Sequence, residues 1–153
     1  YKGISLNIMM QWSYGNKVMN EFRRTRNAMR TTGNLGQDAL ARWKTQGDIT
    51  NFPMIRYQDK MENFRPSSFN MEDGSFLRIK EVTLSYNIPR KWCKKAFLKS
   101  ANVYISGTNL LTWSKYSGYD PEVNTATSAF IRGVDNGAFP KSRSYNLGVN
   151  LTF

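Results

Sequence analysis

The side chains that most often carry catalysis are scarce in this chain. Its 153 residues include no histidine and a single cysteine, Cys93. Without histidine the chain lacks the commonest general base and the usual serine or cysteine triads. One thiol cannot form an internal disulfide, and it has no thiolate or imidazole partners for a metal site. These residue types predict a protein that is not an enzyme and that holds no cofactor or metal.

One pair of carboxylates could still do chemistry. Asp120 and Glu122 lie two residues apart in Tyr119-Asp-Pro-Glu122. Paired carboxylates can act as acid and base, or they can bind calcium. An aspartate before a proline commonly begins a turn, however, so a solvated turn is the simpler interpretation.

The strong positive charge is confined to certain segments. A net charge of +11 is typical of proteins that bind nucleic acids, because clustered lysine and arginine side chains bind backbone phosphates. Four stretches carry no charge at all, namely 3–16, 82–89, 100–114 and 144–153. A soluble antiparallel sheet would normally place lysine and glutamate on its wet face. Uncharged strands joined by charged loops therefore indicate a membrane protein rather than a nucleic-acid-binding one.

Four strands are predicted, at about 3–14, 75–88, 101–113 and 144–153. The last one alternates strictly, with an apolar face made of Tyr145, Leu147, Val149, Leu151 and Phe153 and a polar but neutral opposite face. The uncharged parts of these strands match the ~9 to 11 residues that a tilted strand needs to cross a bilayer. In the second strand the apolar phase changes near Lys80 and Glu81, which predicts a β-bulge.

Aromatic residues mark the ends of these strands. Trp12, Tyr86 and Trp113 lie where an amphipathic ring could sit at the level of the lipid headgroups. We therefore predict that they form part of an aromatic girdle. The alternative is that these rings fill the core of a soluble protein.

The connections between the strands are long, short and long again. They cover 16–74, 87–100 and 114–143. Outer-membrane barrels have short periplasmic turns and longer external loops. This order predicts that the C-terminus and the short connection lie in the periplasm, with both long connections outside.

Four strands are too few to close a barrel. Open edges in lipid would leave unpaired backbone groups, each costing several kcal/mol, so membrane strands must close. We therefore expect this chain to pair with further strands of the same polypeptide. Because Tyr1 opens in the middle of an alternating pattern, we also expect a C-terminal part of something larger, without its signal peptide.

Several motifs carry a family resemblance. They are Gly74-Ser-Phe-Leu-Arg-Ile-Lys-Glu-Val-Thr-Leu-Ser-Tyr-Asn-Ile-Pro89, Val103-Tyr-Ile-Ser-Gly-Thr-Asn-Leu-Leu-Thr112, Gly118-Tyr-Asp-Pro-Glu122 and the Tyr145 to Phe153 ending. In this order they resemble the C-terminal region of the SusC/RagA family of TonB-dependent outer-membrane transporters. The resemblance covers nearly the whole chain.

The resemblance implies an all-β fold, namely the last strands of an antiparallel transmembrane barrel of about 22 strands with long extracellular loops. It implies an integral outer-membrane protein in contact with lipid and lipopolysaccharide. It also implies import of an oligosaccharide or peptide together with a SusD-like surface lipoprotein, driven by the TonB complex through an N-terminal plug part absent here. The alternating residues from Tyr145 to Phe153 would be the signal read by the barrel-assembly machinery.

Two other functions fit the residues. One is a soluble all-β binding module whose basic loops and aromatic rings grip an acidic polysaccharide or nucleic acid. The other is a barrel of the same family that serves attachment or assembly rather than uptake.

Overall fold

The computed structural model describes residues 2–28, 34–56, 62–125 and 132–153. Tyr1 lies outside these ranges. The chain divides into two compact units. The first, called the sheet unit here, comprises Tyr1–Tyr14, Ser75–Lys115 and Pro140–Phe153, and the second, called the loop unit, comprises Gly15–Gly74 and Tyr116–Phe139.

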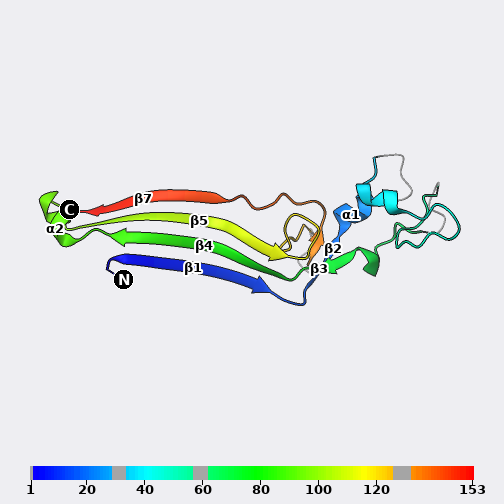
Figure 1. The fold of residues 1–153 in the computed structure, drawn as a ribbon, viewed down its shortest axis with the longest axis horizontal. Helices are drawn as coiled ribbons and strands as arrows, with labels where there is room; N and C mark the ends of the chain where they lie inside the picture. The colour runs from blue at the N-terminus through cyan, green and yellow to red at the C-terminus, as the bar shows by residue number, and fades with distance from the viewer. Residues whose placement is uncertain (1, 29–33, 57–61, 126–131) are drawn as a thin grey trace. The chain divides into compact units, whose positions relative to one another are not determined.

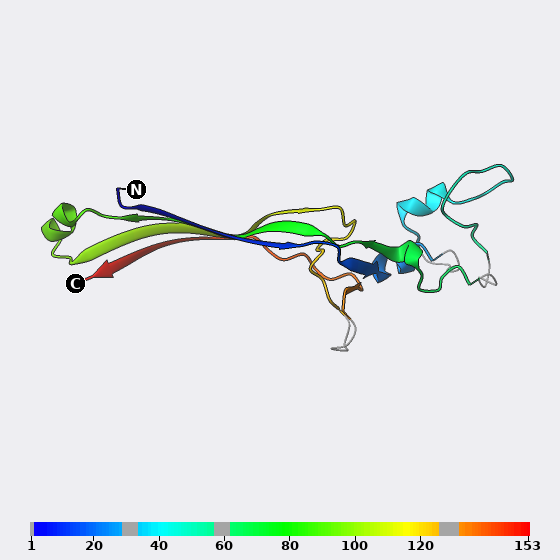
Figure 2. The same cartoon turned by 90° about the horizontal axis from the view of Figure 1, so that it is seen from below.

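Four long antiparallel strands make up most of the sheet unit (Figure 1). They are β1 (Ile4–Ser13), β4 (Phe76–Asn87), β5 (Ser100–Ser114) and β7 (Ser144–Thr152). Their order in the sheet is β1-β4-β5-β7, so β1 and β7 are the edge strands. Figure 2 shows the sheet from a second side, where the strands twist along their length, as strands of L-residues do. The strand ranges expected from the sequence differ from these bounds by at most one residue at each end.

The expected bulge in the second strand is confirmed. Met9 lies opposite Glu81, but Met10 lies opposite Ile79, so Lys80 is an extra residue relative to β1. On its other side, β4 pairs Glu81 with Thr108 and Ile79 with Leu111. Lys80 is therefore opposed by two residues of β5, and one of them, Asn109, has a φ of 52°. Asparagine is among the few side chains that tolerate this left-handed conformation.

The bulge keeps the apolar face of the sheet continuous. Leu77 and Ile79 are out of phase with Val82 and Leu84 in the sequence, but the extra residue returns them to the same face. The rows across the sheet are Ile4–Tyr86–Val103–Val149, Leu6–Leu84–Ile105–Leu147, Ile8–Val82–Gly107–Tyr145, Met10–Ile79–Leu111 and Trp12–Leu77–Trp113. One whole face is thus apolar along all four strands.

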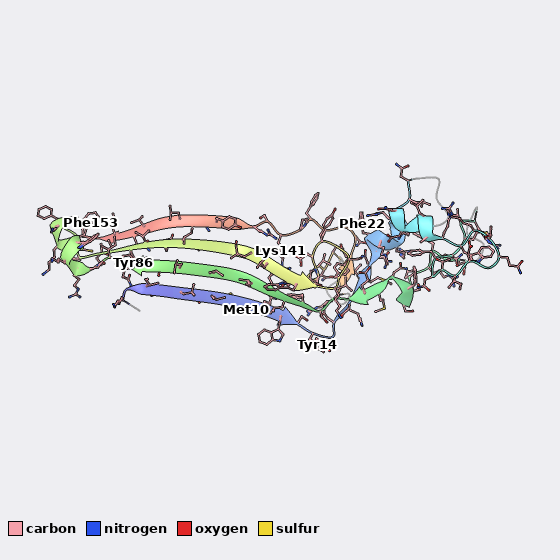
Figure 3. All side chains as sticks on the ribbon, viewed as in Figure 1. Met10, Tyr14, Phe22, Tyr86, Lys141 and Phe153 are labelled. Carbon is pink, nitrogen blue, oxygen red and sulfur yellow. The ribbon has the colours of Figure 1, made fainter. Side chains whose placement is uncertain are left out.

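The two ends of the sheet carry different connections. The last residue of β1, Ser13, lies opposite the first residue of β4, Phe76, which lies opposite Ser114 at the end of β5. Both long connections therefore start from this end. The opposite end carries the helix α2 (Arg90–Lys95), and the labelled side chains of Tyr86 and Phe153 lie toward it in Figure 3.

The loop unit contains a second, small sheet that sequence analysis treated as connections. Its strands are β2 (Lys17–Asn20), β3 (Met71–Asp73) and β6 (Val134–Asp135), in the order β3-β2-β6. β2 is antiparallel to β3 and parallel to β6. The unit also contains α1 (Glu21–Arg26) and the 3₁₀ helices η1 (Gln37–Ala41) and η3 (Ser68–Asn70). Strands of two to four residues are too short to show a period in the sequence.

A small core and a helix cap hold the loop unit together. Val18, Tyr116 and Val123 are buried against one another, and Ala138 packs on them. At the start of α1, Asn20 accepts a hydrogen bond from the Arg23 backbone N–H at 2.8 Å. That bond satisfies one of the free donors at a helix N-terminus. No helix in the described ranges is long and apolar enough to cross a membrane.

Candidate functional site: the faces of the sheet and a loop-unit pocket

The apolar face of the sheet is uncovered. Leu6 is 61% exposed, Ile105 51% and Leu147 77%, although they form one row across the sheet. Soluble proteins rarely expose apolar patches larger than a few hundred Å², and larger ones mark contact with protein or membrane. Because the exposed side chains continue row after row without a charge, the face is suited to lipid hydrocarbon.

The opposite face is polar, and it is neutral near α2 but charged near the bulge. Its rows near α2 are neutral, for example Ser5–Ser85–Tyr104 and Asn7–Thr83–Ser106–Asn146. Counted along β4 from the end that carries α2, the first charged residue is Glu81, close to the bulge. A polar face behind an apolar one is the alternation of a barrel strand, whose second face lines the interior.

Two cations of β4 are held on this polar face by neighbouring strands. The Arg78 Nε donates to the Thr112 Oγ1 at 3.0 Å, and the guanidinium lies 5.4 Å from the centre of the Phe76 ring. Lys80 Nζ donates to the Gln11 Oε1 at 3.0 Å. The charges of this strand are therefore turned away from the apolar face.

The residues of the predicted assembly signal lie together at an edge of the sheet. Tyr145, Leu147, Val149 and Leu151 project from the apolar face of β7 and are at least half exposed. Phe153 follows the last residue of β7 and is 76% exposed. Because β7 pairs with β5 on one side and ends the sheet on the other, its second edge can take a further strand. Recognition by the assembly machinery stays a prediction.

The three girdle residues lie at two levels of the apolar face. Trp12 and Trp113 share a row on either side of Leu77, and Tyr86 shares a row with Ile4 at the other end. Ile4 and Trp12 are eight residues apart along β1, about 27 Å at ~3.4 Å per residue. The apolar band of outer-membrane barrels is about 25 Å tall. The spacing fits a girdle at each interface, and the girdle itself stays a prediction.

A pocket of about 280 Å³ lies in the loop unit. Its lining includes Asn20, Phe22, Arg23, Arg26, Asp38 and Tyr119. Arg23 forms ion pairs with Asp38 and with Glu72, each at 3.3 Å. The Arg26 guanidinium lies 5.5 Å from the centre of the Phe22 ring. A stacked guanidinium beside aromatic and amide groups can bind a carboxylate or a polar sugar face.

Two acidic side chains, Glu72 and the pocket residue Asp135, join different segments of the loop unit. Burial opposes ionisation of Glu72, but hydrogen bonds from the Ser117 N–H, the Ser117 hydroxyl and Asn20, together with the Arg23 charge, lower its pKa below the ordinary value. The hydroxyl of Tyr116 donates to the buried Asp135 at 2.7 Å. Burial and this carboxylate raise the Tyr116 pKa, so the phenol stays protonated.

No local pattern in the sequence predicts this pocket. Asn20, Arg23 and Asp38 come from one long connection, whereas Ser117 and Tyr119 come from the other. The only local signal in the sequence is the pair Asn20-Glu21, a helix N-cap followed by an acidic residue in the first turn, which predicts the start of α1.

The two candidate carboxylates form a turn. The Asp120 Oδ1 accepts from the Glu122 N–H at 2.9 Å, which is the bond of an Asx turn. Within the described parts of the chain, no three His, Cys, Asp or Glu side chains gather as metal ligands would. Cys93 is buried.

Long antiparallel strands with one uncovered apolar face and one polar face define the wall of a membrane β-barrel. Solved structures support this class. The RagAB peptide transporter matches all of this chain with a TM-score of 0.80 and 26% identity, over 16% of the matched chain. The same importer in its open-open state matches with a TM-score of 0.75.

Curated sequences show the same class of relatives. The chain is 32% identical over 159 residues to TonB-dependent receptor P26 and 30% identical over 158 residues to receptor P3, both of Formosa agariphila. It is 25% identical over 154 residues to SusC of Bacteroides thetaiotaomicron. No protein-family model matches the chain. The chain is a homologue of TonB-dependent receptors of the SusC/RagA type, which confirms the resemblance found in the sequence.

The match covers a limited part of each relative. All of this chain is aligned, but it spans only 15% of receptor P3 and 16% of receptor P26. TonB-dependent receptors are outer-membrane transport proteins rather than enzymes.

Proposed function

We propose that this chain forms part of the barrel wall of an outer-membrane transporter that imports oligosaccharides or peptides. The carrying observation is the apolar face, which has three rows that run across all four strands and on which most of the large side chains are exposed. A soluble binding module would have to bury such a face. The relative RagAB is a peptide importer, which supports a peptide as one of the two cargo classes.

The proposed topology follows from the two ends of the sheet. The short connection with α2 and the C-terminal Phe153 lie at one end, and both long connections start from the other. Since barrel strands are joined by short turns on the periplasmic side, we assign α2 and the C-terminus to the periplasm. The long connections that form the loop unit then face the exterior.

We propose different partners for the sheet edges and for the external loops. Further strands of the same polypeptide would pair with the edges of β1 and β7 and close the barrel. The TonB complex would act through a part of the protein outside this chain. A SusD-like lipoprotein would meet the external loops, where the pocket beside Arg26 is a candidate contact for cargo or lipoprotein.

Uptake by cells that carry the full receptor tests this function. Cells would be offered fluorescent oligosaccharide and peptide libraries, with and without a functional TonB complex. We expect accumulation of one class only when both receptor and TonB are present, together with a lipoprotein that copurifies with the tagged receptor. Unchanged uptake after deletion of the receptor, in cells where its expression had been verified, would refute the transport role.

A further inference from the structure

We propose that the turn between β4 and β5, residues 88–99 and called the α2 turn here, binds anionic phospholipid headgroups of the adjacent leaflet. The inference rests on the proposed barrel function, which brings this end of the sheet to a membrane surface. It concerns an interaction surface of the sheet unit. It does not depend on the cargo.

All the charged residues of the α2 turn are basic. Arg90, Lys91, Lys94, Lys95 and Lys99 all lie within it, and all five are exposed. No acidic residue occurs in the chain between Glu81 and Asp120. None of the ion pairs found among the described residues involves these five cations. Clusters of this size beside a membrane-spanning segment are attracted to anionic lipid.

Exposed aromatic rings accompany these charges. Trp92 is 70% exposed and Phe97 is 92% exposed. Phe97 also has a φ of 58°, a left-handed conformation that an aromatic residue rarely adopts and that glycine would adopt without strain. The described residues do not bury its ring. Aromatic rings are favoured in the headgroup region, which gives a physical reason for a ring held at this position.

The turn is fixed to the end of the sheet. Cys93 is only 2% exposed, and its thiol donates to the Ile88 carbonyl at 3.5 Å. The Leu98 N–H donates to the Cys93 carbonyl at 3.0 Å. The Lys99 N–H donates to the Thr152 carbonyl in β7 at 2.8 Å. The cations and rings are therefore presented on a folded turn rather than on a loose loop.

The level of the turn fits the headgroups. Tyr86 ends the apolar rows on β4, and the first cation, Arg90, follows only four residues later. A basic group just beyond the apolar band meets phosphates rather than hydrocarbon. Under the proposed topology this leaflet is the periplasmic one, which consists of phospholipid, so lipopolysaccharide is not the expected ligand.

Lipid binding by the full receptor tests the inference. The receptor would be placed in nanodiscs of phosphatidylethanolamine containing increasing phosphatidylglycerol, and bound phosphatidylglycerol counted by native mass spectrometry. The test variant is K94Q/K95Q, and the matched control is K44Q/R56Q, which removes two exposed cations from the loop unit. Since each cation near an anionic surface contributes on the order of a fivefold change, we expect about a tenfold or larger loss for K94Q/K95Q and less than twofold for the control.

A second variant separates the ring from the fold. F97G removes the aromatic group while suiting the left-handed backbone. We expect its heat stability to equal or exceed that of the parent while its affinity for phosphatidylglycerol falls. Parent-like binding by both K94Q/K95Q and F97G would overturn the inference and would indicate that another part of the protein covers the turn.

Three further outcomes are distinguishable. Receptor that inserts as a folded barrel but binds phosphatidylglycerol and phosphatidylethanolamine equally would overturn this inference alone. Receptor that fails to insert into any bilayer would overturn the barrel function on which it rests. Preferential binding of lipopolysaccharide in a parallel sample, lost in K94Q/K95Q, would reject phospholipid as the ligand.

Discussion

Tyr104 of β5 lies directly across from Gly148 of β7, and its phenol ring fills the space where a side chain at position 148 would stand. A Cβ built on Gly148 would lie 2.4 Å from the Tyr104 hydroxyl oxygen and from its ring. A ring that covers a cross-strand glycine supplies the contact that the glycine lacks. β7 is therefore held to β5 by the contact of Tyr104 with Gly148 on the polar face as well as by the backbone hydrogen bonds between the two strands.

This fit predicts that Gly148→Ala weakens the pairing of β7. The added methyl group must displace the Tyr104 ring and so removes its contact with β7. Cross-strand pairs of this kind contribute about 0.2–1 kcal/mol. In the full receptor we expect a lower temperature for conversion of the folded band to the unfolded band on unboiled gels. Asn150→Ala, on the same polar face, is the control. Equal melting of the two variants would contradict the prediction.

Phe153 is expected to act during assembly rather than during transport. It is largely exposed beyond the end of β7, so its loss removes few contacts from the folded sheet. Deletion of Phe153 should lower the amount of assembled receptor more than it lowers activity per assembled molecule. The control is Phe139→Ala, which removes a 95% exposed ring from the loop unit. Normal assembly of the deletion, measured as heat-modifiable receptor in outer membranes, would count against the signal.

Tyr116→Phe should loosen the loop unit. It removes the donor to the Asp135 Oδ2, although the Gly137 and Ala138 N–H groups still donate to Oδ1. A buried carboxylate oxygen that loses its donor costs about 1–3 kcal/mol. We expect faster protease cleavage between residues 116 and 139 in the full receptor. Tyr119→Phe, at an exposed tyrosine, should cleave at the parental rate, and a parental rate for both variants would be the contrary result.

Glu72 should make the loop unit sensitive to acid. Because its folded pKa is lowered, it contributes stability above its ordinary pKa of 4.5, and this is lost as the pH falls through the folded value. We expect amide exchange near Ser117 to accelerate below about pH 4.5 in the parent, after correction for intrinsic rates. Glu72→Gln should exchange faster at neutral pH and lose most of this acid dependence. Glu62→Gln, at an exposed carboxylate, should retain it.

Long strands and short ones differ in how well sequence predicts them. Alternation extends over nine or more residues in β1, β4, β5 and β7, and β1, β5 and β7 also carry no charge. Local pattern therefore suffices for them, and even the bulge at Lys80 shows as a phase change. β6 has only two residues and lies beside β2, more than a hundred residues earlier. Its position depends on long-range contacts, such as the burial of Val18 against Tyr116, which leave no local period.

The same distinction applies to the candidate sites. The apolar residues of β7 could be assigned to one face because side chains alternate along any strand. The bond between Glu72 and Ser117 joins two separate connections, so neither residue is informative by itself. Gly148 is visible in the sequence, but only the opposing Tyr104 explains why a side chain is excluded there.

Adjacent residues of β7 allow the most direct test of the proposed barrel wall. Leu147 lies on the apolar face and Asn146 on the polar face. Spin labels would be placed singly at positions 146 and 147 of the full receptor, with Cys93 replaced by alanine, after reconstitution in lipid bilayers. We predict that the label at 147 collides mainly with oxygen dissolved in lipid and the label at 146 mainly with a water-soluble nickel chelate. Strong collision of the chelate with the label at 147 would show that this face meets water and would contradict the barrel wall.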